Sequence, residues 1–538
     1  MNHTPPIGAK QAAEAGRLLE RYRQGKQALD RRILEDERWY RLRCYDGGHR
    51  EPDDPEPASA WLFNSLMNKH GDMMDHLPVP NVLPREEGDR RDAGMLTRVL
   101  PVIFERSGFE EIYSRNIYPK LQHGTACYGV FWDKNMNGGA GDIRISDIDV
   151  LNLFWEPGVR DIQDSRSVFL VTYADNELLD AAYPALKGRL RSALTTHDRL
   201  RPEARAVDAA SAAGKSAVVD WYYKKFDEEG RATLHYCKFV GEHVLYASEN
   251  DPDLAVRGFY DHGRYPFVLD VLFPVTGSPA GFGYIDIMKS PQRYIDLLDE
   301  IILRNARLAG KPRWFYRDSC GVNEQEFADW NRDFVHVAGR LEEGDLRQIT
   351  VNPLPAFITN HRLNKVAELK ETSGNRDFTQ GGVAQGVTAA SAITALQEAG
   401  SKLSRDCIRG TYRAYTAVCG LVIELMRQFY DGSRAFRVLG EDGGYEFLPA
   451  PRLLAGRHCG FDIEVRAEKT APQSRLSRNE LARELYRLGF FRPELAEQAL
   501  SALDMMDFEG IAAVRARIEQ NAAAHRMAAA QSEGGTNE

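Results

Sequence analysis

Apolar or small residues recur three or four positions apart from residue 388 to residue 430, and this stretch contains no proline. Such spacing puts the apolar side chains along one side of a helix. Thr388 can cap the start of this helix, because its hydroxyl oxygen can accept a hydrogen bond from a first-turn amide. An uncharged loop with three glycines precedes it, at 381–388. Three further glycines inside the helix predict a bend or a break.

The first 275 residues change from helical periodicity to strand alternation. Helices are expected at 16–44, 61–76, 84–104 (kinked at Pro101) and 109–118 (ended by Pro119). Strands are expected at 126–132, 142–150, 168–173, 218–223, 232–240, 243–247 and 267–273. The glycine-rich stretch 135–141 reads as a hairpin connection. A short helix is expected at 177–186, and 188–216 is polar enough for a surface excursion. This order predicts an α+β fold with a mostly antiparallel sheet.

The second half predicts two helices around a small insert. One helix ends near residue 309, and the other follows two prolines and ends near residue 371. Between them we expect a strand around Trp314, a helix at 323–330, and strands at 334–337 and 346–351. The two helices can lie antiparallel with the insert at their tip. Later elements are short strands at 435–438, 445–448 and 461–465, and helices near 477–489, 493–503 and 507–527, before a polar tail at 531–538.

Composition narrows the class of protein. The 538 residues suffice for about two to four folding units. A formal net charge of −9 argues against a protein that grips DNA phosphates tightly. The seven cysteines include no Cys-x-x-Cys pair, which favours reduced thiols in a cytosolic protein. No stretch reaches the roughly 20 apolar residues of a membrane helix, and no signal-peptide pattern opens the chain. We therefore expect a soluble, intracellular protein without membrane contact.

The glycine loop has the spacing of a phosphate-binding loop without its chemistry. Gly381, Gly386 and Thr388 fit that spacing, but Val387 occupies the place of the phosphate-binding lysine. No apolar strand precedes the loop, so a glycine loop without a nucleotide is the better interpretation. Tight nucleotide binding is not expected from this motif.

Evidence for a catalytic or metal site is weak. The sequence has no His-Glu-x-x-His pattern and no Gly-x-Ser-x-Gly nucleophile motif. An acidic cluster could hold a cation, although acids in such turns more commonly cap turns and helices. It comprises Asp142, Asp147, Asp149, Asp161 and Asp164. We expect no enzyme activity, no metal and no cofactor.

Three strings of residues resemble those of portal proteins from tailed bacteriophages and prophages. The most specific is Gly-Val-Thr-Ala-Ala-Ser-Ala-Ile-Thr-Ala-Leu-Gln-Glu-Ala-Gly at 386–400. The others are Asn-Leu-Phe-Trp-Glu-Pro-Gly at 152–158, followed by Asp-Ile-Gln-Asp-Ser-Arg at 161–166, and Gly-Phe-Gly-Tyr-Ile-Asp-Ile at 281–287. The order of the predicted elements is similar to that family's plan, and the resemblance covers most of the chain.

The resemblance implies a ring, usually a dodecamer, at one vertex of the capsid, with double-stranded DNA passing through its centre. The implied partners are the terminase large subunit, the major capsid and scaffolding proteins, and the head-tail adaptor or neck proteins. The implied places are the virion and, during assembly, the host cytoplasm. The implied domains are a wing at 1–285, stem helices at 286–309 and 353–377, a clip at 310–352, a tunnel loop at 378–388, a long helix with wing strands at 389–472, and a helical crown with a disordered tail at 473–538.

By position, the resemblance also implies which residues would meet DNA. The candidates in and beside the tunnel loop are Arg376, Phe378, Gln380, Gly381, Gly382, Gln385, Gly386 and Thr388. Lys365 and Lys370 are candidates for stem residues that face the channel. Two alternatives stay open at this point. One is a DNA-processing enzyme, such as a nuclease or a translocating ATPase, and the other is a minor capsid protein without a channel.

Overall fold

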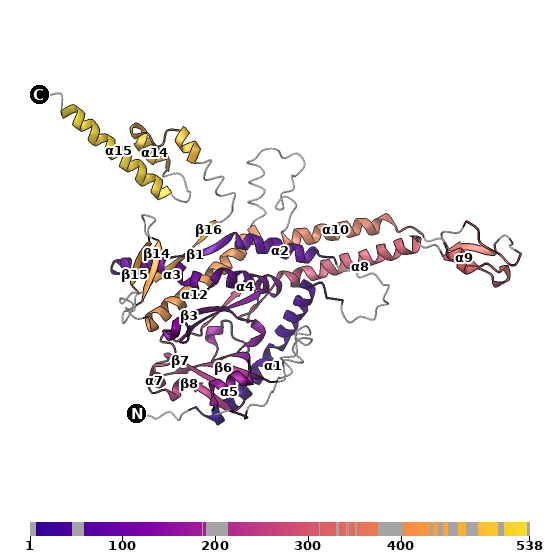
Figure 1. The fold of residues 1–538 in the computed structure, drawn as a ribbon, viewed down its shortest axis with the longest axis horizontal. Helices are drawn as coiled ribbons and strands as arrows, with labels where there is room; N and C mark the ends of the chain where they lie inside the picture. The colour runs from indigo at the N-terminus through magenta and orange to yellow at the C-terminus, as the bar shows by residue number, and fades with distance from the viewer. Residues whose placement is uncertain are drawn as a thin grey trace. The chain divides into compact units, whose positions relative to one another are not determined.

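The computed structural model describes residues 7–45, 59–184, 187–189, 214–310, 313–329, 333–340, 342, 344–349, 352–374, 402–430, 434–439, 445–449, 461–469, 482–503 and 511–534. Figure 1 shows a mixture of helices and strands, and this confirms the α+β prediction. The chain divides into two compact units. The larger comprises Met1–Met74 and Pro78–Arg466, and the smaller comprises Asp75–Leu77 and Ala467–Glu538.

A five-stranded antiparallel sheet in the larger unit has the order β4-β5-β6-β7-β8. Its strands are β4 (Leu153–Trp155), β5 (Ser167–Asp175), β6 (Lys215–Phe226), β7 (Ala232–Val240) and β8 (His243–Ala247). Helix α1 (Ala9–Tyr40) packs on it through Ala12, Ala15, Leu19 and Tyr22, which share a core cluster with Phe154 and Phe169. The small α5 (Asn176–Ala182) packs near β6 through Leu179. The repeat of apolar residues on α1 therefore serves to cover one face of a sheet.

A second sheet has the order β3-β2-β9. Its strands are β2 (Thr125–Asp133), β3 (Asp142–Asp147) and β9 (Phe267–Val271). The connection between β2 and β3 is a hairpin, as the glycine-rich stretch predicted. Gly141, at φ 73°, lies so close to Trp132 that a Cβ atom would come within 2.3 Å of that ring. The ring of Trp132 in turn stacks on Phe429, with ring centroids 4.7 Å apart.

Helices α2 (Trp61–Met74), α3 (Arg90–Arg106) and α4 (Phe109–His123) lie close to the predicted ranges. The prediction that Pro119 ends its helix is wrong, since α4 continues to His123. The end is set by Gly124, which has a φ of 85° and whose amide bonds to Lys120. Burial of Leu121 at 1% exposure offsets the hydrogen bond that proline cannot make.

Strand β1 (His76–Pro84) was missed, because its three prolines suggested a loop. In the part of the chain that the structure describes, it forms a two-stranded sheet with β16 (Phe461–Lys469). Side chains support that pairing, since Asn81 donates to Glu464 at 3.0 Å and Arg85 donates to Asp462 at 2.9 Å. Proline is tolerated in such an edge strand, where one side of the backbone makes no ladder hydrogen bonds.

The long helix is described as α12 (Lys402–Phe429). It is unbroken over this range, so the predicted break does not occur at Gly410 or Gly420. Val418, Val422 and Leu425 are fully buried, and this packing outweighs the low helix propensity of glycine. The earlier part of the predicted helix, at 389–401, lies outside the described residues.

Outside residues 284–373, which are described below, the remaining elements of the larger unit are short. They are η1 (Glu87–Asp89), η2 (Asn137–Gly139), η3 (Val150–Asn152), η4 (Ile162–Asp164), η7 (Ser248–Asn250), α7 (Leu254–Arg257), β10 (Phe273–Pro274), β11 (Gly281–Phe282), β14 (Ala435–Leu439) and β15 (Tyr445–Pro449). The predicted strand at 142–150 ends early, at Asp147, and η3 follows.

The smaller unit is mainly helical. It contains a helix at 482–487, then η11 (Pro493–Leu495), α14 (Ala496–Leu503) and α15 (Ile511–Gly534). The helices α14 and α15 pack through Ala496, Ala499, Leu503, Ile518 and Ala522. The predicted helical C-terminal segments agree with this arrangement over the described residues.

A buried ion pair joins three elements of the larger unit. Lys120 of α4 donates from Nζ to Oδ1 of Asp270 on β9 over 2.6 Å, and both side chains are at most 2% exposed. Thr411 of α12 donates to the other oxygen of Asp270 over 2.9 Å. Lys120 also bonds the carbonyl of Cys407, 3.2 Å away. These contacts lock α4 and α12 to the three-stranded sheet.

Candidate functional site

Two long helices form an antiparallel pair, called the arm below: α8 (Tyr284–Gly310) and α10 (Ala356–Ser373). Arg362 of α10 pairs with Asp299 of α8. Further along, Val366 and Leu369 of α10 pack on Ile295. Contacts at higher numbers on α10 meet lower numbers on α8, so the helices run in opposite directions. Figure 1 shows them side by side, and this confirms the predicted antiparallel pair.

The base of the arm is anchored by a buried carboxylate. Asp296 of α8 is 1% exposed and accepts hydrogen bonds from Tyr45, from Gln292 and from both the amide and the hydroxyl of Ser59. Burial raises the pKa of Asp296 above its ordinary value, while these donors oppose the shift. Gln292 also accepts from the Leu62 amide at 3.2 Å. The arm is therefore fixed to the start of α2 through polar contacts.

A second buried carboxylate lies where α1 meets α8. Asp36 is fully buried, and its nearest cation is Lys289 at 3.8 Å. Lys289 is shared with Glu35 and Asp286, at 3.5 Å and 3.6 Å. Burial, reinforced by the charge of Asp286, raises the pKa of Asp36 to about 8, although Lys289 and Arg32 oppose the shift. Asp36 is therefore largely protonated at neutral pH in the folded protein.

Replacing Asp36 with asparagine should flatten the pH dependence of stability. Between about pH 4 and pH 8 the unfolded carboxyl has lost its proton while folded Asp36 keeps it, so folding stability falls as pH rises. We expect the native chain to lose about 3–4 kcal/mol more than Asp36→Asn between pH 5 and pH 8. Denaturant unfolding at the two pH values measures this. Glu35→Gln, at a more exposed neighbour, is the control, and parallel losses in native chain and Asp36→Asn would contradict the assignment.

The arm carries a small insert between its helices. Strand β12 (Arg313–Tyr316) pairs antiparallel with β13 (Leu346–Ile349), beside η8 (Asp318–Cys320) and α9 (Glu324–Ala328). Trp314 meets Phe327 edge-on, with ring centroids 5.7 Å apart. The predicted strand at 334–337 is wrong, because only Val337 forms a bridge there, with Val322. A two-stranded sheet and one short helix give this insert few side chains of its own to bury.

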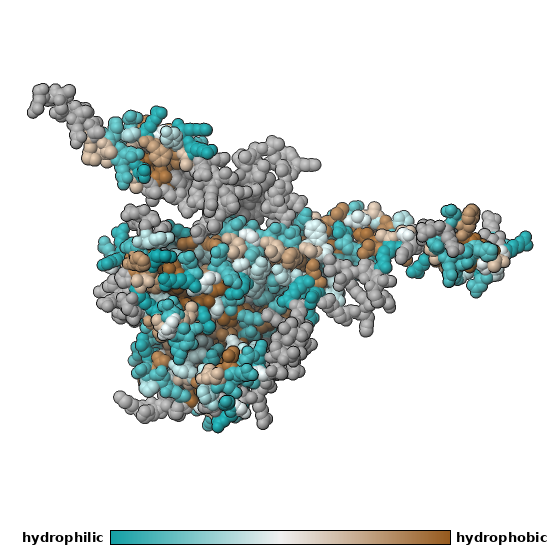
Figure 2. All heavy atoms as spheres, in the orientation of Figure 1, coloured by the Kyte–Doolittle hydropathy of each residue, from teal (hydrophilic) through white to brown (hydrophobic). Residues whose placement is uncertain are grey.

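Large apolar side chains are exposed along the arm and the insert. On α8, Tyr294, Leu297, Ile301 and Leu308 follow one stripe at helical spacing, and each is 41–52% exposed. On α10 and in the insert the exposed apolar residues include Phe357, Leu363, Phe315, Phe327 and Phe334. Figure 2 shows hydrophobic side chains along this part of the surface. A patch of this kind is typical of a surface that another protein covers.

The candidate lysines of the arm already have contacts within the chain. Lys365 is paired with Glu368 at 2.6 Å, and its ammonium lies 5.6 Å from the ring centre of Tyr294. Lys370 lies 5.7 Å from the ring centre of Trp61. Lys365 and Lys370 both belong to α10, where they are separated by little more than one helical turn. The candidates of the glycine loop, from Arg376 to Thr388, lie outside the described residues.

The acidic cluster serves local structure. Asp149 caps η3 by accepting from the Leu151 amide at 3.0 Å, and Asp161 caps η4 through the Gln163 amide at 2.9 Å. Asp142 accepts from the hydroxyl of Tyr430. Within the described ranges, no three His, Cys, Asp or Glu side chains are placed to share a metal ion. In the same ranges, no helix combines the length and the apolar character needed to span a membrane.

The described fold is a mixed helix and sheet body with a two-helix arm that carries a small insert. The sequence matches the Phage P22-like portal protein family over residues 70–536 of 538, so the chain belongs to that family. It is a family of structural proteins rather than of enzymes. No curated protein matches the chain.

Proposed function

We propose that this protein assembles as a ring at a unique capsid vertex and conducts double-stranded DNA through its centre during packaging and ejection. The observation that carries the proposal is the exposed apolar stripe of α8, in a chain of the portal family. Neighbouring copies would bury that stripe. A surface that contacts a different surface on the next copy generates a closed ring when the rotation closes. We propose a dodecamer as the assembled form.

The proposed domains follow the order of elements along the chain. Residues 1–285 would form a wing, 286–309 and 353–377 a stem, and 310–352 a clip. Residues 378–388 would form a tunnel loop, 389–472 the long helix with wing strands, and 473–538 a crown. Two observations support the stem and clip: the antiparallel packing of α8 and α10, and the exposed aromatic side chains of the insert. We propose that the clip meets the terminase large subunit during packaging and the neck proteins afterwards.

The charge of the chain is suited to a channel that DNA slides through. Each phosphate held by a lysine or arginine adds to affinity, so a strongly basic wall would retain DNA. The chain has a formal net charge of −9, and Lys365 is already paired with Glu368. Weak, transient contacts from Lys365 and Lys370 would therefore leave DNA free to move. The major capsid and scaffolding proteins are the proposed partners that place the ring in the shell.

Negative-stain electron microscopy of the purified full-length protein tests this proposal. Rings with a stained central hole are expected, and end views give the number of subunits. Compact particles of one subunit at high protein concentration, with and without scaffolding protein, would contradict the proposed ring assembly. Assays of ATP hydrolysis and metal-dependent DNA cleavage by the same sample separate a portal from a DNA-processing enzyme, because the proposed channel has neither activity.

Replacing Arg376, Gln380 and Gln385 together by alanine or serine should reduce DNA packaging while rings still form. In the proposed tunnel loop these side chains would touch DNA without carrying the ring contacts. The measurement is the amount of nuclease-protected DNA in particles assembled with the variant, beside electron microscopy of the isolated variant. Replacing Gln428, which lies on α12 and binds Phe259, provides a control outside the loop. If the variant packaged as much DNA as the native chain, the proposed contact of these three residues with DNA would be wrong.

A further inference from the structure

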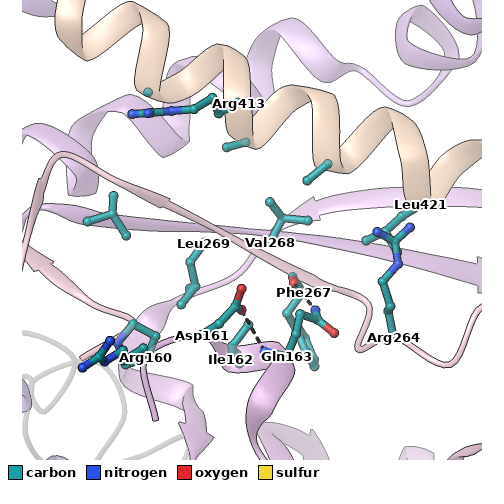
Figure 3. Close-up of a pocket in the computed structure, with 15 residues that line it drawn as sticks. Arg160, Asp161, Ile162, Gln163, Arg264, Phe267, Val268, Leu269, Arg413 and Leu421 are labelled. Atoms are coloured by element: carbon teal, nitrogen blue, oxygen red, sulfur yellow. Dashed lines mark hydrogen bonds between the residues drawn. The ribbon is translucent and has the colours of Figure 1, made fainter. Parts of the chain in front are cut away.

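A cavity of about 440 Å³ lies between η4, strand β9 and helix α12. Figure 3 shows Phe267, Val268 and Leu269 along one side of it, the 160–163 segment below, and α12 above. Its apolar lining includes Ile162 and Leu421, which are both buried. This volume lies within the usual range for binding sites, and none of the described lining residues belongs to the arm.

One side of the cavity is the open edge of a sheet. In the order β3-β2-β9, strand β9 has a partner on one side only among the described strands. Leu272 donates to Gly124 and Val130 donates to Pro266 across the β2–β9 pair, each at 2.9 Å. Because backbone direction alternates along an antiparallel strand, residues 268 and 270 also face β2. The backbone groups of residues 267, 269 and 271 therefore point away from the sheet.

Gln163 already uses the start of this open edge. Its side-chain amide donates to the carbonyls of Tyr265 and Phe267, at 3.1 Å and 3.3 Å, and accepts from the Tyr265 amide at 2.9 Å. The side-chain amide of Gln163 therefore makes the backbone hydrogen bonds that one residue of a neighbouring strand would make. Leu269 continues the same edge beside the cavity and is half-buried. The edge is thus prepared to pair with backbone for a short distance beyond Gln163.

Three arginines surround the cavity without a carboxylate partner among the described residues. Arg160 precedes η4, Arg264 precedes β9 and Arg413 lies on α12. Figure 3 shows their side chains at separate points around the cavity. The acid of the described lining, Asp161, accepts from the Gln163 amide to cap η4. Guanidinium groups without a carboxylate partner can form charge-assisted hydrogen bonds with the carboxylates or phosphates of a bound molecule.

We propose that this cavity binds an extended acidic segment of a different protein, which adds a strand to the edge of β9. Backbone groups of the segment would bond Leu269, its alternate apolar side chains would enter the cavity, and its carboxylates would meet the arginines. The combination of a free strand edge and an apolar lining favours peptide over nucleic acid, which would use the arginines alone. This site does not depend on the ring or on the channel.

The described strands of the chain itself do not offer a matching acidic segment. Glu446 of β15 is paired with Arg98, Asp462 of β16 with Arg85, and Asp147 of β3 with Arg115. Glu464 of β16 accepts from Asn81. These four carboxylates of the described edge strands are therefore already engaged within the chain. In the proposed complex, the carboxylates that meet the cavity arginines therefore come from another protein.

The test uses the full-length protein and a short fluorescent peptide of alternating valine and glutamate, followed by anisotropy. We expect saturable binding that weakens about tenfold in Arg264→Gln/Arg413→Gln, which corresponds to about 1.4 kcal/mol. Leu269→Pro should weaken it similarly, since proline removes an outward amide that the β2–β9 ladder does not use. Arg409→Gln, also exposed on α12 but outside the cavity, should bind as the native chain does. Thermal melts confirm that each variant is folded.

Three results would overturn the proposal. Equal binding of a backbone N-methylated peptide would exclude strand addition. Displacement of the peptide by inorganic phosphate or by a DNA duplex, at lower concentration than by unlabelled peptide, would make the arginines a phosphate site. Loss of self-association in the Arg264→Gln/Arg413→Gln variant would assign the cavity to a contact between copies of this chain. None of these results bears on whether the native protein forms rings.

Discussion

Replacing Lys120 with methionine is expected to lower the free energy of unfolding of the larger unit by about 3–5 kcal/mol. Methionine keeps most of the side-chain volume, so the cavity left behind is small. The loss comes from Asp270, whose carboxylate is 2% exposed on the side chain and would keep Thr411 as a donor but lose its cation. An unpaired charge at this depth is strongly unfavourable. Denaturant unfolding followed by far-UV circular dichroism measures the change.

Two further variants make that result specific to the buried pair. Removing both charges in Lys120→Met/Asp270→Asn should recover most of the lost stability, because no charge is then left unpaired. Arg115→Met breaks the exposed pair of Arg115 with Asp147 and should cost no more than about 1 kcal/mol. If Lys120→Met and Arg115→Met were equally mild, the Lys120–Asp270 pair would not be what holds α4 and α12 to the sheet.

The sequence predicted those parts of the fold that rest on short-range periodicity. The helices α2, α8, α10 and α12 were expected from apolar spacing and flanking prolines, and the β2–β3 hairpin from its glycine-rich turn. Strand β1 was missed, because prolines remove amide donors and only a distant edge partner makes the strand possible. Pairing of β1 with β16 depends on residues almost four hundred positions apart, which no local pattern encodes.

The site was predicted less completely than the fold. Lys365 and Lys370 lie on the second arm helix, within its predicted range. Lys365 meets Glu368 on that same helix, but the contacts with Tyr294 and Trp61 join helices far apart in sequence. The Lys120–Asp270 pair joins residues 150 positions apart, and neither residue stands out in its local sequence. The three arginines of the cavity are equally ordinary in sequence. These arginines line one cavity because the fold brings η4, β9 and α12 together.

Introducing two negative charges into the stripe of α8 should abolish ring assembly. Leu297 and Ile301 are 41% and 46% exposed and lie one turn apart, on the side of α8 that also carries Tyr294 and Leu308. In the proposed ring each copy would bury them against a neighbour. Full burial of one such side chain contributes about 1.5–3 kcal/mol, and the loss recurs at every contact around the ring. Leu297→Asp/Ile301→Asp should therefore remain a single subunit under conditions in which the native chain forms rings.

Sedimentation velocity and negative-stain microscopy measure this change in assembly directly. The variant should keep the far-UV spectrum of the native chain, since the replaced side chains already lie partly in solvent. Val256→Asp is the matched control: Val256 is 89% exposed on the short α7 and belongs to no apolar stripe, so its rings should persist. Single exposed apolar residues of that kind are common on monomers, whereas a stripe along a helix indicates a partner. Intact rings from Leu297→Asp/Ile301→Asp would place the subunit contacts elsewhere and leave the stripe of α8 for a different protein.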